Sequence, residues 1–348
     1  MMPNTRAACG FALAVLSLSL SPHPASTHPK NPETTAAEMI TPAADRAIKQ
    51  GLAFLVARQQ PDGGFGSGNY RGNVALSGLA GLALMSSGST PGRGPYGRQI
   101  NRCVDYLLAN TQESGFIIAP QSKSHGPMYG HGFAALFLAE CYGMSPRPEL
   151  REKLSKAVKL IVNTQNKEGG WRYQPQRADA DISVTICEVM ALRAARNAGL
   201  HVPKETIDRT IGYVKRSQNA DGGFMYMIQG GESDFARSAA GVVALHSAGV
   251  YEGPEVKKGL DYLVQFIPRE GLVRRERYYY YGHYYAVQAM WQAGGDYWAR
   301  WYPTVRDELI SRQRQDGSWM SPISNDYATA MACFVLQVPN NYLPIIQR

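Results

Sequence analysis

The sequence lacks the long apolar runs of a membrane protein, and it has few cysteines. No stretch reaches the roughly 18 uncharged apolar residues that a membrane-spanning helix needs. Cys9 lies in the N-terminal stretch, and the other four cysteines fall in separate apolar segments that are expected to be helical: Cys103, Cys141, Cys187 and Cys333. Such surroundings are typical of buried free thiols, so we expect these four to be unpaired and predict no disulfide framework.

Clustered positive charge is also scarce. The net charge of +8 is spread along the chain, apart from Arg274-Arg275-Glu276-Arg277, which is typical of a solvated turn. Nucleic-acid binding would require a basic stripe and a recognisable module, and neither is present, so we expect no nucleic-acid partner. A composition of 44% hydrophobic and 18% charged residues is that of a globular protein.

The N-terminus has the pattern of a secretory signal. Arg6 precedes the apolar run from Ala7 to Leu20, and small residues follow, although His23 and Pro24 disturb the usual cleavage spacing. The pattern predicts a signal peptide over residues 1–26 and export to the periplasm or the medium; a stray apolar N-terminus is the alternative. Residues 27–42 are rich in Pro, Thr and Ala and are interpreted as a linker.

From residue 43 onward the chain repeats one element, of which Gln218-Asn219-Ala220-Asp221-Gly222-Gly223-Phe224 is the clearest copy. The glutamine markers recur at intervals of 53, 53, 53, 47 and 48 residues, and they are Gln59, Gln112, Gln165, Gln218, Gln265 and Gln313. The fifth copy is degenerate and keeps only Glu270-Gly271-Leu272. Six units near one period indicate a repeat architecture, so residues 43–348 are predicted to form a single domain.

Each unit has two apolar segments, one on either side of its marker. The segment before the marker is amphipathic, with apolar residues at three- and four-residue steps, which predicts an outer helix with one buried face. The segment after it, such as Val74 to Leu84, is apolar nearly all round and rich in Ala and Gly, which predicts an inner helix covered on every side. Six such units predict an all-α fold: an α/α toroid of six helical hairpins, with about twelve helices in an inner and an outer ring.

The marker itself is predicted to be structural. Glycine permits a tight reversal after the outer helix, and the aromatic residue can pack over that turn. The glutamine amide can donate to exposed backbone groups of the next unit. We therefore assign the marker no catalytic role.

The repeated Gln-x-x-Asp-Gly-Gly-aromatic element resembles the QW repeat of the squalene cyclase and protein prenyltransferase β-subunit superfamily. The resemblance extends from about Ala43 to Leu336. It implies an α/α toroid whose central cavity accommodates a hydrophobic, isoprenoid-like small molecule.

The resemblance also implies where chemistry would occur. In the squalene cyclase branch an Asp-x-Asp-Asp motif supplies the acid that protonates the substrate, and Asp179 and Asp181 match its first and central aspartates, the central one being the proton donor. Ile182 departs from the last aspartate. The Asp-x-Cys pair through which the prenyltransferase branch binds zinc is missing, since Met331-Ala332 precede Cys333. We therefore predict no cofactor, while a metal ion stays open.

The first residues of the six inner helices should gather at one mouth of the toroid, because each helix follows the same turn. The polar and aromatic residues in these positions are Tyr70 and Asn73, Tyr129 and His131, Asp179 and Asp181, Asp234 and Arg237, Tyr281 and His283, and Asp326 and Tyr327. Burial in a partly apolar cavity shifts pKa values, so this ring is the candidate site. Asp and Asn also favour helix N-caps, which is the alternative role of Asn73, Asp181, Asp234 and Asp326.

Within this ring we expect Asp181 to act as the acid, Asp179 to support it, and His131 and His283 to assist. The two histidines occupy matching positions and are candidates for general acid/base chemistry or metal binding, with plain packing as the alternative. The residues expected to bind the substrate are Asp234, Arg237, Tyr281, Tyr129, Asp326 and Tyr327.

Three functions fit these observations. The first is an exported terpenoid-cyclase-like protein, whose aromatic wall from Tyr278 to Tyr285 would stabilise a carbocation. The second is a secreted polysaccharide lyase or hydrolase, with a glycan in an open groove over Tyr281, His283 and Arg237. The third is a binding or scaffold protein in which the aspartates only cap helices.

Overall fold

The computed structural model describes residues 1, 31–145, 147–268 and 278–347 of the chain. The predicted signal peptide, apart from residue 1, the degenerate marker residues Glu270-Gly271-Leu272 and the cluster Arg274-Arg275-Glu276-Arg277 lie outside the described residues. Part of the predicted linker forms a 3-10 turn, η1 (Pro32–Thr35), and one short helix, α1 (Ala36–Met39).

The helices that follow alternate between an outer and an inner ring. The outer helices are α2 (Pro42–Arg58), α4 (Gly97–Ala109), α6 (Pro148–Thr164), α8 (Lys204–Arg216), α10 (Pro254–Leu263) and α12 (Gly295–Arg312). The inner helices are α3 (Val74–Met85), α5 (Pro127–Met144), α7 (Ile182–Asn197), α9 (Phe235–Ser247), α11 (Tyr279–Ala293) and α13 (Asn325–Gln337). Short 3-10 turns are η2 (Gly68–Tyr70), η3 (Val264–Phe266), η4 (Val338–Asn340) and η5 (Pro344–Ile346).

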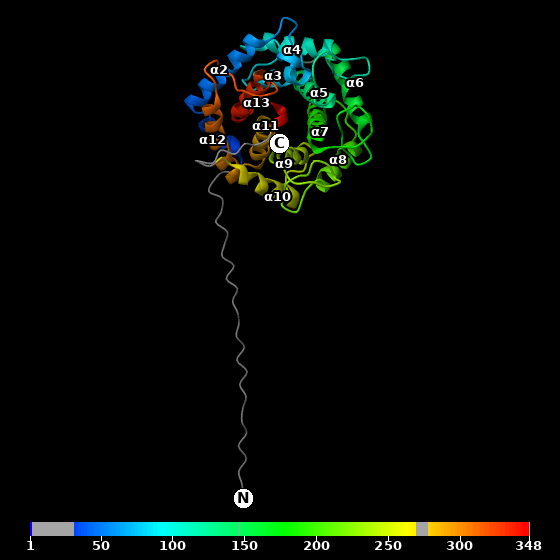
Figure 1. Ribbon diagram of the computed structural model, residues 1–348, viewed down its shortest axis with the longest axis vertical. Coiled ribbons are helices and arrows are strands. Elements are labelled where there is room, and N and C mark those ends of the chain that lie inside the picture. Colours follow the sequence, from blue (N-terminus) through cyan, green and yellow to red (C-terminus); the bar gives the residue numbers. More distant parts are fainter. Residues whose placement is uncertain (2–30, 146, 269–277, 348) are drawn as a thin grey trace.

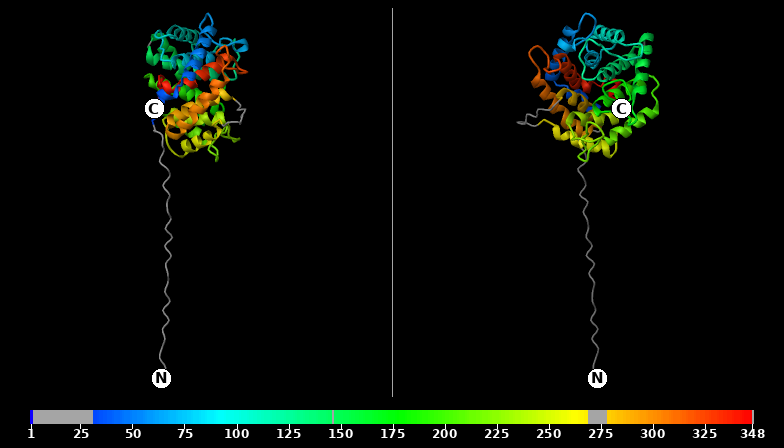
Figure 2. Two further views of the ribbon diagram at one scale, coloured as in Figure 1. Left: turned by 90° about the vertical axis from the view of Figure 1, so that its left-hand side faces the viewer. Right: turned by 45° about the vertical axis from the view of Figure 1, so that its right-hand side comes forward.

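The inner helices form a closed ring. Each packs against the next along the chain, and α13 packs against α3, so that the last repeat lies beside the first (Figure 1). Each outer helix covers two neighbouring inner helices, and α12 also contacts α2. Figure 2 shows the same ring from two further directions, with the first repeat in blue next to the last in orange and red. The predicted all-α toroid with an inner and an outer ring is confirmed.

Small residues allow the inner helices to approach one another closely. A Cβ on Gly132 of α5 would lie 2.7 Å from the Cβ of Cys187 on α7, and one on Gly81 of α3 would lie 2.3 Å from the Phe137 ring of α5. Neither glycine has a positive φ, so backbone conformation does not require glycine at these positions. Glycine is required there because a side chain would not fit between the helices. The Ala- and Gly-rich composition of the inner segments is explained by this close packing.

The predicted tying role of the glutamine is confirmed in four repeats. The Gln165 side chain donates 3.0 Å to Gly169 O in its own turn and 2.9 Å to Thr206 O in the next outer helix, α8. Gln59, Gln218 and Gln313 donate in the same way to Gln99 O of α4, Glu255 O of α10 and Ala47 O of α2. The last of these bonds links the final repeat to the first.

The second and fifth repeats depart from this pattern. In the second, Thr111 rather than Gln112 occupies the glutamine position, because Thr111 bridges to Ile117 as Gln218 bridges to Phe224. The assignment of Gln112 as the marker is therefore wrong by one residue. The Thr111 hydroxyl donates to Leu107 O of the preceding helix, α4. Gln265, in η3, likewise donates to Asp261 O of the preceding helix, α10.

The four cysteines within the described residues are free and buried, as expected. None of the described helices combines the length and the hydropathy that a membrane crossing requires.

Candidate functional site

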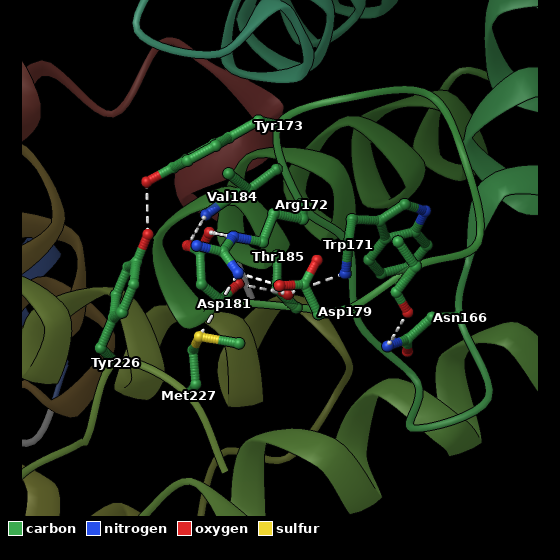
Figure 3. A network of polar contacts seen from close by, with 11 residues as sticks. Asn166, Trp171, Arg172, Tyr173, Asp179, Asp181, Val184, Thr185, Tyr226 and Met227 are labelled. Carbon is green, nitrogen blue, oxygen red and sulfur yellow. Dashed lines mark hydrogen bonds and ion pairs between the residues drawn. The ribbon is translucent and has the colours of Figure 1, made fainter. Parts of the chain in front are cut away.

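Asp181 is the N-cap of α7, and its side chain is completely buried. Its Oδ1 atom accepts a hydrogen bond of 2.9 Å from Val184 N, so the predicted capping role is present. Its Oδ2 atom accepts no hydrogen bond within the described structure and lies 3.6 Å from Arg172 Nε. One carboxylate oxygen therefore caps the helix, while the other faces Arg172 (Figure 3).

Arg172 lies between the two aspartates of the Asp179-Ala180-Asp181 motif. Its guanidinium forms an ion pair with Asp179, whose side chain is 45% exposed, and its Nε atom faces Asp181 (Figure 3). The guanidinium also stacks over two tyrosine rings, with its centre 5.0 Å from the ring centroid of Tyr173 and 5.6 Å from that of Tyr226. Asp179 thus balances the charge of Arg172 at the solvent side, and Asp181 takes the buried side.

Tyrosines from four repeats surround this acid. The hydroxyl groups of Tyr173 and Tyr226 are hydrogen-bonded to each other. Tyr129 of α5 lies 6.0 Å from Tyr173 and 6.5 Å from Tyr281 of α11, measured between ring centroids. Tyr281 also donates a 2.7 Å hydrogen bond to Ser183 O, two residues from Asp181. The structure therefore brings Asp181, Tyr129 and Tyr281 together, as predicted for the mouth.

Burial raises the pKa of Asp181 to about 6, and the Val184 amide and Arg172 oppose that increase. Burial, followed by the charge of Asp181, holds the pKa of Tyr129 well above its ordinary value. Tyr129 thus remains neutral, whereas a pKa of about 6 allows Asp181 to exchange a proton near neutral pH.

Aromatic side chains of α11 fill the centre of the toroid beneath the mouth. The Tyr285 hydroxyl lies 3.3 Å from Cys187 Sγ on α7, although α9 separates these two helices in the ring. The Tyr284 ring packs against the rings of Phe133 of α5 and Phe334 of α13, at centroid distances of 5.9 and 4.7 Å. The centre of the toroid is therefore lined and bridged by aromatic rings.

His131 points toward the outer ring. It is fully buried, its Nδ1 atom accepts a 3.1 Å hydrogen bond from Ile117 N, and its Nε2 atom lies 3.3 Å from Ala157 O. Burial lowers its pKa to about 4. In the first, third, fourth and sixth repeats a serine or threonine hydroxyl accepts the equivalent bond, as Thr185 does from Trp171 N. Because backbone groups contact both ring nitrogens, the structure gives His131 an anchoring role rather than the predicted assistance to Asp181.

His283 is also buried and lies away from Asp181. Its ring packs between Phe235, Tyr279 and Trp301, at centroid distances of 5.0, 4.3 and 5.6 Å. The last of these residues belongs to the outer helix α12. His131 and His283 therefore occupy matching positions, as the sequence indicated, but both are directed toward the outer ring.

The remaining predicted residues are distributed around the mouth. Asp234 caps α9 by accepting from Ala236 N and Arg237 N, and the Arg237 guanidinium lies 5.9 Å from the Tyr226 ring, close to the acid. Asp326 is not a cap, since Ser324 caps α13. Asp326 instead forms a 3.2 Å ion pair with Arg58 of α2. Tyr327 is half-buried near the start of α13.

Sequence reasoning did not identify Arg172, Tyr173 and Tyr226 as site residues. All three immediately follow a repeat marker: Tyr173 and Tyr226 each come two residues after the marker aromatic, Trp171 and Phe224. The backbone of Tyr226 also accepts from Ile182 N at 3.1 Å, which holds the fourth marker turn beside the start of α7. Alignment of the repeats on their aromatic residues would have found both tyrosines.

A separate polar cavity of about 530 Å³ lies between the first and second repeats. It is lined by Gln60, Asp62, Gly68, Asn69, Arg71, Gly72, Tyr106, Gln121 and Lys123. Neither Tyr281, His283 nor Arg237, the expected floor of a glycan groove, lines it. Within the described ranges, no group of three or more His, Cys, Asp or Glu side chains is arranged to hold a metal ion.

The fold and this mouth define an α/α toroid with a buried aspartate beneath tyrosines. A family model described as the squalene-hopene cyclase C-terminal domain matches residues 134–279, and one described as the prenyltransferase alpha-alpha toroid domain matches residues 14–133 and 44–157. The predicted resemblance to the squalene cyclase and prenyltransferase superfamily is therefore confirmed, and the chain has a terpene-cyclase-like toroid fold.

One characterised protein resembles part of the chain at low sequence identity. Drimenyl diphosphate synthase from Streptomyces showdoensis is 24% identical over 178 residues, which are 51% of this chain and 32% of that protein. The match thus spans about a third of that relative's length.

Solved structures of other proteins share the fold of this chain at low sequence identity. The type II terpene cyclase MstE from Scytonema, in complex with its product merosterolic acid A, has a TM-score of 0.62 at 13% identity, over 86% of this chain and 97% of that one. The α-1,6-mannanase GH76A from Salegentibacter, in complex with α-1,6-mannotriose, has a TM-score of 0.63 at 6% identity, over 86% and 99%.

Proposed function

We propose that this protein is a terpenoid-cyclase-like enzyme, in which Asp181 protonates an isoprenoid substrate bound at the aromatic mouth of the toroid. The observation that supports this most is the geometry of Asp181: a fully buried carboxyl group, one oxygen of which accepts no hydrogen bond and faces Arg172, placed under tyrosines. The family matches and the type II terpene cyclase fold favour the same chemistry.

The proposed reaction begins with the protonated form of Asp181. Its O–H transfers the proton to a terminal alkene carbon, whose π electrons form the new C–H bond and leave a cation on the adjacent carbon. The faces of Tyr129, Tyr281 and Tyr285 are suited to stabilise that cation. Further alkenes of the same chain then attack it, and loss of a proton completes an overall isomerisation.

Ile182 replaces the last aspartate of the family motif, and in this proposal Arg172 is the charged neighbour of Asp181. After proton transfer the Asp181 carboxylate is stabilised by the Val184 amide and by the Arg172 guanidinium. The same guanidinium favours the ionised carboxyl group beforehand, so Asp179, paired with Arg172, moderates this effect. The acid is therefore expected to operate best under mildly acidic conditions, where more of Asp181 carries its proton.

The test is incubation of the purified mature protein with farnesol, geranylgeraniol and squalene, followed by gas chromatography and mass spectrometry. We expect a cyclised isomer of one probe with the natural protein and none with Asp181→Asn, while binding of that probe persists. If neither protein binds any of the three, the proposal is wrong. Binding without conversion by either protein would favour a scaffold or carrier role.

A glycan-active protein is the second candidate, and the polar cavity near Arg71 and Lys123 favours it. Planar amide, guanidinium and carboxylate groups suit the recognition of sugar hydroxyls. Titration with α-1,6-mannotriose, the ligand of the structurally similar mannanase, provides a direct test. Binding that is lost in Arg71→Ala and retained in Asp181→Asn would support this candidate over the first.

We retain export through residues 1–26 as part of the proposal, on the strength of the sequence pattern. Expression of the full chain in a bacterial host, with mass spectrometry of the N-terminus, tests it. Recovery outside the cytoplasm with an N-terminus near residue 27 is expected, whereas a cytoplasmic protein that retains residues 1–26 would contradict it.

A further inference from the structure

Asp181 is covered where two loops of the mouth meet. Its side chain is completely buried, and the hydroxyl groups of Tyr173 and Tyr226, from the third and fourth repeats, are joined by a hydrogen bond in this cover. The Arg172 guanidinium stacks on both tyrosine rings and faces the carboxyl group (Figure 3). None of these residues lines the polar cavity of the first two repeats. A ligand can therefore reach Asp181 only when part of this cover moves.

The fourth repeat contributes one loop to the cover, residues 225–233, which we call the mouth loop. Besides the tyrosine pair, it contacts the third repeat at three points: Ile182 N donates 3.1 Å to Tyr226 O, Arg172 Nη1 lies 3.4 Å from Met227 Sδ, and Gln229 Nε2 lies 3.4 Å from Glu168 Oε1. A thioether sulfur is a weak acceptor, and the last contact is long and exposed to solvent. The tyrosine pair and the Tyr226 carbonyl are thus the main ties that hold the loop over the acid.

The mouth loop is anchored at its two ends and exposed at its tip. The anchors lie within the fourth repeat: Met225 N donates 2.9 Å to Ser217 O, and the Asn219 side chain donates 3.0 Å to both Gly231 O and Ser233 Oγ. At the tip, Gly230 and Gly231 have φ values of 125° and 127°, and a Cβ on either would meet nothing within 4 Å. These glycines therefore serve the backbone conformation rather than close packing. Small changes of their dihedral angles can move the tip without disturbing the marker turn.

We propose that Tyr173 and Tyr226 form the gate to Asp181, with the mouth loop as its moving part. This inference rests on the proposed function. Opening separates the two hydroxyl groups and uncovers the carboxyl group for an isoprenoid chain. Closure over the bound chain excludes water from the cation that the proton transfer creates. The hydroxyl pair sets how often the gate opens, because each opening breaks that hydrogen bond.

Chemical labelling of Asp181 measures the gate without any substrate. The purified mature protein is treated with a water-soluble carbodiimide and glycine methyl ester in mildly acidic buffer, and mass spectrometry of peptides follows the labelled fraction of Asp181 over time. Tyr173→Phe removes one hydroxyl group of the gate and leaves the mouth loop itself unchanged. Tyr70→Phe is the matched control, because the Tyr70 hydroxyl forms a 2.9 Å hydrogen bond with the His125 ring in a different part of the chain. Circular dichroism verifies that each variant is folded.

A cross-link tests the closed gate. Gln229→Cys and Glu168→Cys together place two thiols on facing sides, where the natural side chains are 3.4 Å apart, and a short bis-maleimide joins them. The four cysteines within the described residues are buried, which protects them from the reagent. The same double variant without the reagent is the control.

We expect labelling of Asp181 in Tyr173→Phe to be about fivefold faster than in the natural protein, the effect of losing one neutral hydrogen bond, and Tyr70→Phe to match the natural rate. The cross-link should suppress both labelling and conversion of farnesol, geranylgeraniol and squalene. Equal labelling rates in all of these folded proteins would overturn the gate and leave the proposed function intact. Labelling that follows the gate, with no conversion of any probe by the natural protein, would support the gate and contradict the proposed function.

Discussion

Three carboxyl groups are buried on the inner helices α5 and α7, and their surroundings give them different roles. Asp181 lies at the mouth beside Arg172 and has a pKa raised by burial to about 6. Glu140 accepts a hydrogen bond from Ile345 N near the C-terminus, and burial raises its pKa to about 8. Glu188 has no hydrogen bond within the described structure, and burial holds its pKa well above the ordinary value. Of the three, Asp181 is the one placed to meet a ligand at the mouth.

Cyclising activity should depend on pH through Asp181. The active form is the protonated acid, so the rate is expected to fall about tenfold per unit as pH rises beyond a pKa of about 6. Arg172→Met removes the neighbouring positive charge, which favours the protonated carboxyl group and should move the profile to higher pH. Initial rates across a pH series provide the measurement. Arg177→Met, at an exposed arginine of the same loop, is the control, and an identical shift in both variants would contradict the assignment.

Glu188 should limit stability at neutral and alkaline pH. Its folded-state pKa is raised, so its contribution to stability is fully present below the unfolded-state pKa and is lost as pH rises toward the folded-state pKa. Glu188→Met is expected to increase the free energy of unfolding by about 1–3 kcal/mol at alkaline pH, with a smaller gain in acid. Urea unfolding at several pH values tests this. The same gain in the exposed control Glu252→Gln, or a gain independent of pH, would contradict it.

The sequence predicted which residues belong to the site better than it predicted the direction in which their side chains point. Asp181 was predictable because its motif resembles that of a known family, and its capping role because aspartate favours that position. His131 and His283 were correctly placed at matching positions, yet helix periodicity alone did not show which side of the helix faces the centre of the ring. Arg172 and Tyr226 were missed because they lie in turns, where neither helical periodicity nor a capping preference applies.

Among the elements, the marker turn acts as the joint between successive repeats. In the third repeat Gln165 is 1% exposed, and its amide donates to Gly169 O, Thr206 O and Thr210 Oγ1. The composition of the marker predicted this arrangement, because an amide with two donors can satisfy carbonyl groups at the end of one helix and the start of the next. The change to Thr111 in the second repeat was not predictable while Gln112 stood beside it.

Gln165→Ala should therefore destabilise the protein, whereas Gln112→Ala should not. The first substitution leaves buried carbonyl groups without donors, with an expected cost of about 1–3 kcal/mol. The second is a matched control in the adjacent repeat, since Gln112 is exposed and Thr111 occupies the marker position. Free energies of unfolding from urea titration give the comparison. Equal costs in the two variants would show that the marker glutamine does not act as a tie.

The C-terminal segment is an element that sequence reasoning did not find. Residues 338–347 carry no marker and no helical periodicity, and their position depends on Glu140, Arg193 and Gln292 from three distant helices. Such contacts are set by the closure of the ring, which no local pattern encodes. The helical repeats were predictable because their signal is local and recurs six times.

Over the whole molecule, closure of the ring distinguishes this repeat protein from a linear array. Gln313 donates 2.9 Å to Ala47 O, and Asp326 of α13 pairs with Arg58 of α2. Gln337 of α13 also donates 3.0 Å to Ala83 O of α3, so several polar contacts join the last repeat to the first. Terminal repeats of a linear array have one neighbour and can unfold first. Here each inner helix has two neighbours in the ring, so we expect the chain from residue 43 onward to unfold in one transition.

Arg58→Met tests this closure. The Asp326 side chain is 2% exposed, burial raises its pKa, and Arg58 opposes that increase. Without Arg58 the folded-state pKa should rise further, so the loss of stability should grow as pH increases above the ordinary pKa of an aspartate. Arg58 is 45% exposed, which reduces the expected cost to about 1–2 kcal/mol.

The measurement is urea unfolding followed in parallel by circular dichroism and by tryptophan fluorescence, to which Trp319 beside the closure contributes. The two signals should coincide in the natural protein and in Arg58→Met, with the midpoint of the variant lowered. Arg46→Met, on an exposed face of the same helix α2, should leave the midpoint unchanged. If fluorescence changes before circular dichroism in Arg58→Met, the closed ring has become an open array, and its cooperativity depends on this one ion pair.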